Sequence, residues 1–354
     1  MFQTQLIKKK IDLKILYLVI VRTMDITKML KDANEDRVKK LSDNSIKVYN
    51  SNLKILNKLI TNEDSIKNID FIKDIDKVYD VLSEKSIHTK KNYTTAIIVL
   101  LKILKEEELY KQYARIQDKL SNKIEDNYDE NSKTETQKEN WVDYKEVLDL
   151  LNKYKRDAKP ILKKDKNDLT KKDLQLIQQY LVLYLYSGKA FDIIRNDFAN
   201  MKIVDDEKDL ETDKNYLVIP KKRKTPYFHL GEYKTKKSKT NDNEPFIIPL
   251  KDTDLNNLIR IWITINDSEY LLINLSGNQN TEKGSPMTAN GITKYLQKIF
   301  KNNLGKSIST SLLRSIYITH KYKQNLNTKQ KKELATNMLH SKPMAEQVYN
   351  KIVV

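Results

Sequence analysis

Apolar residues recur every three or four positions along the first third of the chain, and this spacing restricts the fold more than any other feature. The first run follows Ser45 and comprises Ile46, Tyr49, Leu53, Leu56 and Ile60. Two more runs cover residues 69–82 and, after Thr89, residues 93–104. Because a helical turn takes 3.6 residues, each run places its apolar side chains on one helix face. Residues 25–122 are therefore predicted to form a helical domain, with Ser45 and Thr89 at helix starts.

A polar segment over residues 123–140 follows this domain and lacks helical apolar periodicity. We interpret it as an interdomain linker. Core residues return at Trp141 and Val142, so residues 141–354 are expected to form a second domain.

The first 24 residues stand apart from this pattern. The apolar stretch Ile11–Val21 is interrupted by Asp12 and Lys14 and is too short to span a bilayer. It is not followed by the small-residue cleavage site of a signal peptide. We therefore expect no membrane association. Residues 1–24 are interpreted as an N-terminal extension, with Met1 and Met24 both open as the start.

The second domain mixes helices with short strands. Thr170 and Asp173 form a capping-box pattern before a helix. Three strand candidates follow, at residues 216–219, 227–230 and 246–250. The helical pattern returns after Thr288. The chain is therefore expected to be mostly α with a small three-stranded β-sheet, an α+β fold.

Composition excludes several kinds of chemistry. The chain has no cysteine, four histidines and six glycines. Thiolate chemistry and disulfides are thus excluded, a histidine-rich metal centre is disfavoured, and a glycine-rich phosphate loop has no room. We expect no metal and no cofactor. The formal charge of +17 favours an acidic partner, above all double-stranded DNA. The alternative is a solvated surface encoded by an A/T-rich genome.

A cluster of basic and hydroxyl side chains stands at the start of the third helical run. It comprises His88, Thr89, Lys90 and Lys91. Backbone amides at a helix N-terminus favour a phosphate, so these residues are candidates for DNA binding. The alternative is an ordinary capped helix.

The last forty-odd residues carry the most informative spacing. Ser311 and Arg314 are followed by Thr319-His320, then by Met338-Leu-His340-Ser, and Tyr349 stands nine residues after His340. This order resembles the C-terminal signature of the tyrosine recombinases, the phage-integrase-like enzymes of DNA strand exchange. That signature has an HxxR box, a Leu-Gly-His-Ser type turn and a tyrosine nine residues later.

The resemblance continues upstream. Ile194-Arg195-Asn-Asp-Phe198 is similar to the first-arginine box of integrases from large DNA viruses and virophages, and a strand entry at Met201–Ile203 keeps that register. Lys189 in Ser-Gly-Lys is the alternative counterpart. Tyr233-Lys234-Thr235 resembles the hairpin that carries the family's lysine, although Lys236, Lys237 and Lys239 crowd the same loop.

The resemblance implies a helical core-binding domain and a catalytic domain that cleaves DNA through a 3′-phosphotyrosyl link. Tyr349 would be the nucleophile and Lys234 the acid that protonates the leaving 5′-oxygen. Arg195 and Arg314 would bind the phosphate oxygens, and His340 would donate a hydrogen bond to the phosphate. Lys236 and Lys237 are further candidates for DNA contacts.

The box at Ser311 departs from the family, which most often has histidine there. Ser311 is therefore a doubtful catalytic candidate: it either hydrogen-bonds the phosphate or caps a helix.

The resemblance also implies that four protomers form a homotetramer on synapsed DNA. Alternatives that share the chemistry are a type IB topoisomerase and a telomere-resolving enzyme. A degenerate recombinase that only binds DNA is the non-catalytic alternative, and a structural basic protein is another. The protein is expected to be intracellular, wherever its target DNA resides: host nucleus, cytoplasm or viral factory, with the virion also open.

Overall fold

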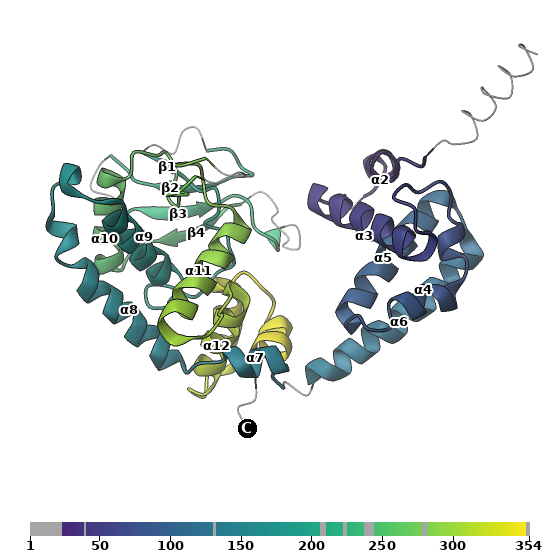
Figure 1. Cartoon of the computed structure of the whole chain (residues 1–354). Helices are drawn as coiled ribbons and strands as arrows, with labels where there is room; N and C mark the ends of the chain where they lie inside the picture. The colour runs from purple at the N-terminus through teal and green to yellow at the C-terminus, as the bar shows by residue number, and fades with distance from the viewer. Residues whose placement is uncertain are drawn as a thin grey trace, which may run out of the picture. The chain divides into compact units, whose positions relative to one another are not determined.

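The computed structural model describes residues 23–38, 40–129, 132–205, 210–221, 225–236, 244–277 and 282–351. The chain separates into two compact units, residues 1–130 and 131–354, and the colours of Figure 1 follow both along the chain. The expected N-terminal extension, apart from Thr23 and Met24, lies outside the described residues, as do Lys237 and Lys239. No helix in the described part of the chain is long and apolar enough to cross a membrane.

The N-terminal unit is a bundle of helices around one apolar core. Its elements are α2 (Ile26–Glu35), α3 (Asp43–Thr61), η1 (Asp70–Ile72), α4 (Ile75–Val81), α5 (Ile87–Leu104) and α6 (Glu107–Asp129). Helix α5 packs against α3 and α6, and α2 covers both α3 and α5. Tyr113 on α6 is buried and donates from its hydroxyl to the Ile72 carbonyl at 2.8 Å, which ties α6 to η1. The helical character predicted from the apolar spacing is confirmed.

Several boundaries differ from those expected in this unit. Ser42, not Ser45, caps α3, because its hydroxyl accepts from the Ser45 amide. Ser86 caps α5 in the same way, which places Thr89 within the first turn. The helix expected over residues 69–82 is interrupted, because Asp74 caps α4 and starts a new helix after η1.

The segment at residues 123–140 is largely helical, although its sequence lacks apolar periodicity. Helix α6 continues to Asp129, and α7 (Glu135–Asn140) begins at a capping box formed by Thr134 and Gln137. Caps and exposed pairs such as Lys138–Glu135 supply local stabilisation that needs no apolar face.

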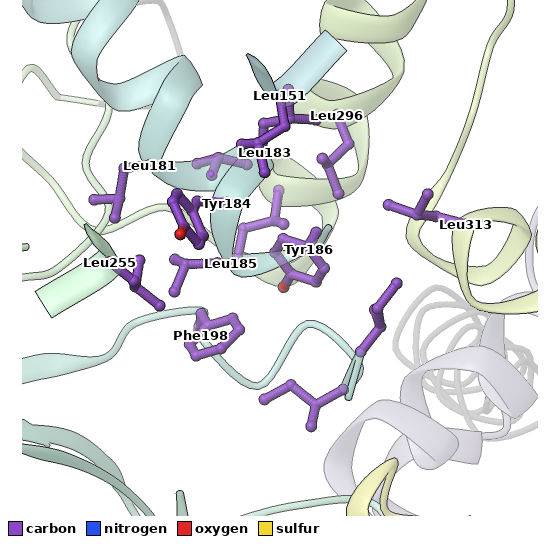
Figure 2. Close-up of a cluster of buried hydrophobic side chains, with 14 of the residues drawn as sticks. Leu151, Leu181, Leu183, Tyr184, Leu185, Tyr186, Phe198, Leu255, Leu296 and Leu313 are labelled. Carbon is purple, nitrogen blue, oxygen red and sulfur yellow. The ribbon is translucent and has the colours of Figure 1, made fainter. Parts of the chain in front are cut away.

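The C-terminal unit surrounds one central helix, α9 (Lys171–Leu185). The Thr170–Asp173 capping box predicted for its start is confirmed. Nine of its fifteen residues are buried, so both of its faces are covered. Its neighbours are α8 (Tyr144–Ala158), α10 (Thr253–Ile265) and α11 (Ala289–Leu304). Figure 2 shows Leu181, Tyr184 and Leu185 of α9 in this core, with Leu151, Leu255 and Leu296 nearby.

The sheet has one strand more than the three expected. Its strands are β1 (Lys202–Val204), β2 (Asn215–Val218), β3 (Tyr227–Leu230) and β4 (Phe246–Pro249), paired in that order. Strand β1 runs parallel to β2, and the other pairs are antiparallel. Phe228 on β3 packs edge-on against Phe198, which in turn packs edge-on against Tyr186. This aromatic chain joins the sheet to the end of α9. The fold is thus mostly helical with a small mixed sheet, the α+β class expected.

The last elements follow α11, which begins after its cap Thr288, where the helical pattern was expected to return. They are α12 (Thr310–Tyr322), α13 (Thr328–Asn337) and η5 (Met344–Tyr349). Helix α12 contacts both α8 and η5. The short helices η2 (Ile161–Lys163) and η3 (Lys166–Asp168) link α8 to α9.

Candidate active site

Tyr349 is the last residue of η5, a π-helix. The Asn350 amide donates to the Ala345 carbonyl at 2.9 Å, a bond that spans five residues. Wide turns of this kind are rare and are frequently found at functional sites. The Tyr349 side chain is 8% exposed. Its ring stacks on that of His340, with centroids 5.2 Å apart and planes 15° apart. The structure thus brings together the two residues that the sequence placed nine positions apart.

Arg314 lies beside this stack. Its guanidinium carbon is 4.9 Å from the centroid of the Tyr349 ring. The side chain is 1% exposed and donates to the carbonyls of Ile193 at 3.2 Å and Met338 at 3.0 Å. Its Nε is buried without a hydrogen-bond partner. Burial lowers the pKa of Arg314 to about 10, so the group stays a cation at neutral pH. The result is a fixed positive charge with one donor unused.

The Arg195 side chain reaches the surroundings of Tyr349 from the segment after α9. Its Nη1 donates to the Leu339 carbonyl at 2.7 Å. Its own carbonyl accepts from the buried Tyr186 hydroxyl at 3.1 Å. The alternative counterpart, Lys189, lies elsewhere: its Nζ sits over the Tyr184 ring and 3.9 Å from Asp254. Of the two candidates, the structure brings Arg195 to Tyr349.

The segment that carries Lys234 and Lys236 is anchored to the Leu339 carbonyl, to which Arg195 also donates. The Thr235 hydroxyl donates to the Leu339 carbonyl at 3.0 Å. Lys234, its neighbour, is exposed in a turn. Lys236 instead donates from Nζ to the carbonyls of Thr212 at 2.7 Å and Gly231 at 2.6 Å. Lys236 is therefore held by backbone carbonyls, whereas the Lys234 side chain is exposed.

His340 is oriented by the end of α13. The amides of Leu339 and His340 donate to the carbonyls of Thr336 and Ala335, both at 3.0 Å, which forms a Schellman motif. Leu339 takes the left-handed position of that motif, with φ +57°. The Leu-Gly-His-Ser type turn that this segment resembles has glycine at the corresponding position, the residue that adopts this conformation without strain. The sequence shows the leucine, but not that it must be left-handed.

The protonation of His340 follows from its contacts. Its Nδ1 lies 3.1 Å from the Ser341 carbonyl, so Nδ1 carries the hydrogen. Nε2 is buried without a partner. Burial, reinforced by the charge of Arg314, lowers the pKa of His340 to about 4. At neutral pH and without a ligand, Nε2 therefore presents a lone pair, and it can donate to a phosphate only after the ring gains a proton.

The phenol of Tyr349 has a perturbed pKa. Burial raises this pKa, but the charges of Arg314 and Arg195 and the nearby donor groups of Ser311 and Arg314 outweigh burial and lower it. Ser311 therefore lies near the phenol. The alternative that Ser311 caps the helix is wrong, because Ser309 caps α12 by accepting from the Leu312 amide.

Asp197 is a half-buried acid with a buried Oδ2 atom, and the sequence pattern did not single it out as a site residue. Burial raises its pKa to about 6, against the opposing charges of Arg314 and Arg195. Its Oδ2 has no hydrogen-bond partner. The only sequence signal was its place two residues after Arg195.

The candidate DNA-binding residues of the N-terminal unit occupy the first turns of α5. His88 is exposed, and Thr89, Lys90 and Lys91 are half-buried. The Thr89 amide donates to the Ser86 hydroxyl at 3.3 Å, so the helix is capped as expected. A capped helix N-terminus can also bind a phosphate, so DNA binding by these residues stays a prediction.

No three histidine, aspartate or glutamate side chains within the described ranges come together as a metal site. Comparisons of the chain with protein-family models, with curated proteins and with solved structures find no match.

Proposed function

We propose that the chain cleaves and rejoins DNA strands through a 3′-phosphotyrosyl intermediate, and that it acts as a site-specific recombinase or integrase. The observation that supports this most strongly is the environment of Tyr349. Its phenol is buried, yet two arginines and Ser311 lower its pKa. Perturbed groups of this kind concentrate at functional sites.

The nucleophilic step uses that perturbation. A phenol with an ordinary pKa of about 10 is a poor nucleophile at neutral pH. Lowering the pKa increases the fraction present as phenolate, which attacks phosphorus and displaces the 5′-oxygen. The bond formed joins Tyr349 to the 3′-phosphate, and the bond broken frees the 5′-hydroxyl end.

The two arginines would stabilise the transition state. Arg314 is fixed by two backbone carbonyls and has an unused Nε donor, while Arg195 is fixed by a third carbonyl. Guanidinium groups match the geometry of phosphate oxygens. Because the donors are already ordered, stabilising the extra charge at phosphorus costs little reorganisation.

The leaving 5′-oxygen needs a proton, which we assign to Lys234. Its neighbour Thr235 ties the hairpin to the Leu339 carbonyl, to which Arg195 also donates. His340 becomes a donor to the phosphate once the anion favours protonation of Nε2. The covalent link retains the energy of the phosphodiester, so the reverse attack by a 5′-hydroxyl rejoins the strand.

The partner in this proposal is double-stranded DNA, in keeping with the net charge of +17. The N-terminal unit would add phosphate contacts from the first turns of α5. We propose a homotetramer on two synapsed sites, because exchange between two duplexes requires four cleaved strands.

The test uses a nicked suicide duplex that carries the sequence flanking the gene, so that cleavage releases a short strand and traps the adduct. Wild type should form a covalent complex that survives denaturation, and Tyr349→Phe should form none. Tyr322→Phe is the matched control, because Tyr322 is a half-buried tyrosine of the same unit. A wild-type protein that binds this DNA without any adduct would exclude the enzyme and leave a DNA-binding protein.

A further inference from the structure

The carboxylate of Asp192 joins three segments of the C-terminal unit. Its Oδ1 accepts from the Tyr317 hydroxyl at 2.5 Å, and its Oδ2 accepts from the Asn337 amide at 2.9 Å. Tyr317 belongs to α12 and Asn337 ends α13, while Asp192 lies in the segment between α9 and β1. Hydrogen bonds to an ionised carboxylate are stronger than neutral ones, so this connection is a firm one.

Asp192, Tyr317 and Asn337 lie close in the sequence to Arg314 or to the residues whose carbonyls bind it. Ile193, which follows Asp192, and Met338, which follows Asn337, supply the two carbonyls that accept from the guanidinium. Tyr317 stands three residues after Arg314, about one turn along α12. The Arg314 guanidinium with its two carbonyls forms one set of contacts, and the Asp192 carboxylate with its two donors forms a second. Each residue of the second set lies one residue or one helical turn along the chain from a residue of the first.

The Tyr317 ring is itself held in place. A Cβ added to Gly188 would come within 2.4 Å of this ring, so the backbone at Gly188 packs directly on it. The ring of Tyr144 packs against it with centroids 5.4 Å apart, and the Tyr144 hydroxyl donates to the Ser187 carbonyl at 2.7 Å. The hydroxyl of Tyr317 is thus aimed at Asp192 by packing on two sides.

We infer that Asp192, through Tyr317 and Asn337, is a positioning residue that fixes the two carbonyls on which the Arg314 guanidinium rests. This inference rests on the proposed function, which gives Arg314 its role at the phosphate. Asp192 does not act on substrate. It holds the backbone around Arg314 in one arrangement, as a catalytic group supported by surrounding hydrogen bonds requires.

A cavity beside this network helps to separate it from the nucleophile. The cavity has a volume of 480 Å³, and Asp192, Tyr317 and Asn337 line it together with Lys189 and Lys321. Tyr349 is not among its lining residues. Changes at the network therefore act on Tyr349 through the backbone, which supplies the carbonyls that bind Arg314 and also continues to Arg195 and His340.

The test compares Tyr317→Phe and Asp192→Asn with a matched control, Tyr184→Phe. Tyr184 is also buried and also donates its hydroxyl to an aspartate, Asp252 at 2.9 Å, but this pair does not involve the segments around Arg314. The chain has eight arginines, so the Nε–H signal of Arg314 can be followed by NMR in the free protein and assigned by its loss in Arg314→Lys. Cleavage rate, DNA affinity and the pH profile of cleavage are measured in parallel.

We expect the Arg314 signal to move in Tyr317→Phe and Asp192→Asn and to stay in place in Tyr184→Phe. Cleavage should slow by roughly 10- to 100-fold in the two network variants at nearly unchanged DNA affinity, because small displacements of a catalytic group have effects of that size. Cleavage should also reach its plateau at higher pH, since a displaced Arg314 lowers the pKa of Tyr349 less.

An Arg314 signal that does not move, or cleavage that slows equally in Tyr184→Phe, would overturn the inference. Should Tyr317→Phe fail to fold, Asn337→Ala at a half-buried position carries the same test. The NMR measurement needs no DNA. A wild-type protein without cleavage activity would therefore count against the proposed function alone, and the Arg314 signal would still decide the positioning.

Discussion

Leu339 has a strained backbone conformation and lies in the candidate site. At this position we predict that a glycine variant is more stable than an alanine variant, the reverse of the usual order in helices. Its φ is +57°, and its side chain is 1% exposed. Replacing it with alanine should cost about 2–5 kcal/mol, the usual range for a buried leucine. Glycine removes the same side chain but also removes the left-handed strain, which is worth about 1–2 kcal/mol. The glycine variant should therefore be about 1 kcal/mol more stable than the alanine variant.

At an ordinary helix position the order is opposite. Glu333 is exposed in α13, a short distance before Leu339. There, Glu333→Ala should be more stable than Glu333→Gly by about 1 kcal/mol. Both tryptophans, Trp141 and Trp262, belong to the C-terminal unit, so urea unfolding followed by tryptophan fluorescence reports on that unit alone. If alanine is the more stable residue at both positions, residue 339 is not left-handed and the described end of α13 is wrong.

Three further predictions concern protons and salt. Lys234→Ala should slow cleavage by about 100-fold or more. A substrate with sulfur at the bridging 5′-position should restore the cleavage rate of this variant, because a thiolate leaves without a proton. If that substrate instead restores cleavage in Lys236→Ala, the general acid is Lys236. His340 has a pKa of about 4 when folded against 6.5 when unfolded. Its stabilising contribution is therefore present above pH 6.5 and is lost as pH falls towards 4, by about 2 kcal/mol between pH 7.5 and pH 5. The raised pKa of Asp197 changes stability with pH in the opposite direction. The measurement is therefore the difference in unfolding free energy between wild type and His340→Asn at each pH. A difference that does not change with pH would contradict the lowered pKa of His340. DNA affinity should fall steeply with salt, each neutralised phosphate adding roughly 0.9 to the log–log slope, and a flat dependence would mean that the positive charge does not contact DNA.

Local signals in the sequence predicted much of the fold. The capping box at Thr170 and the helix after Thr288 were confirmed because these patterns involve residues a few positions apart. Strand β1 was expected only as a strand entry at Met201–Ile203 and not as a member of the sheet, since three residues are too few to show a period and its partner β2 lies more than ten residues away. The helices at residues 123–140 were missed because caps and exposed ion pairs, and not an apolar face, support them.

For the candidate site, the spacing of residues in the sequence identified the side chains but not the backbone carbonyls that fix their positions. Arg314 and Arg195 are fixed by the carbonyls of Ile193, Met338 and Leu339. Every residue has a carbonyl, so the sequence carries no mark of these acceptors. The neutral state of His340 is equally hidden, because it depends on burial and on the charge of Arg314 in three dimensions.

The most direct test of the central claim is to locate the covalent bond between protein and DNA. The trapped complex from the suicide duplex would be digested and the DNA-bearing peptide identified by mass spectrometry, with the DNA labelled in turn at each end of the cleaved strand. The account predicts one peptide, modified at Tyr349 and linked to a 3′-phosphate. A link to a 5′-phosphate, or to any other residue, would contradict it.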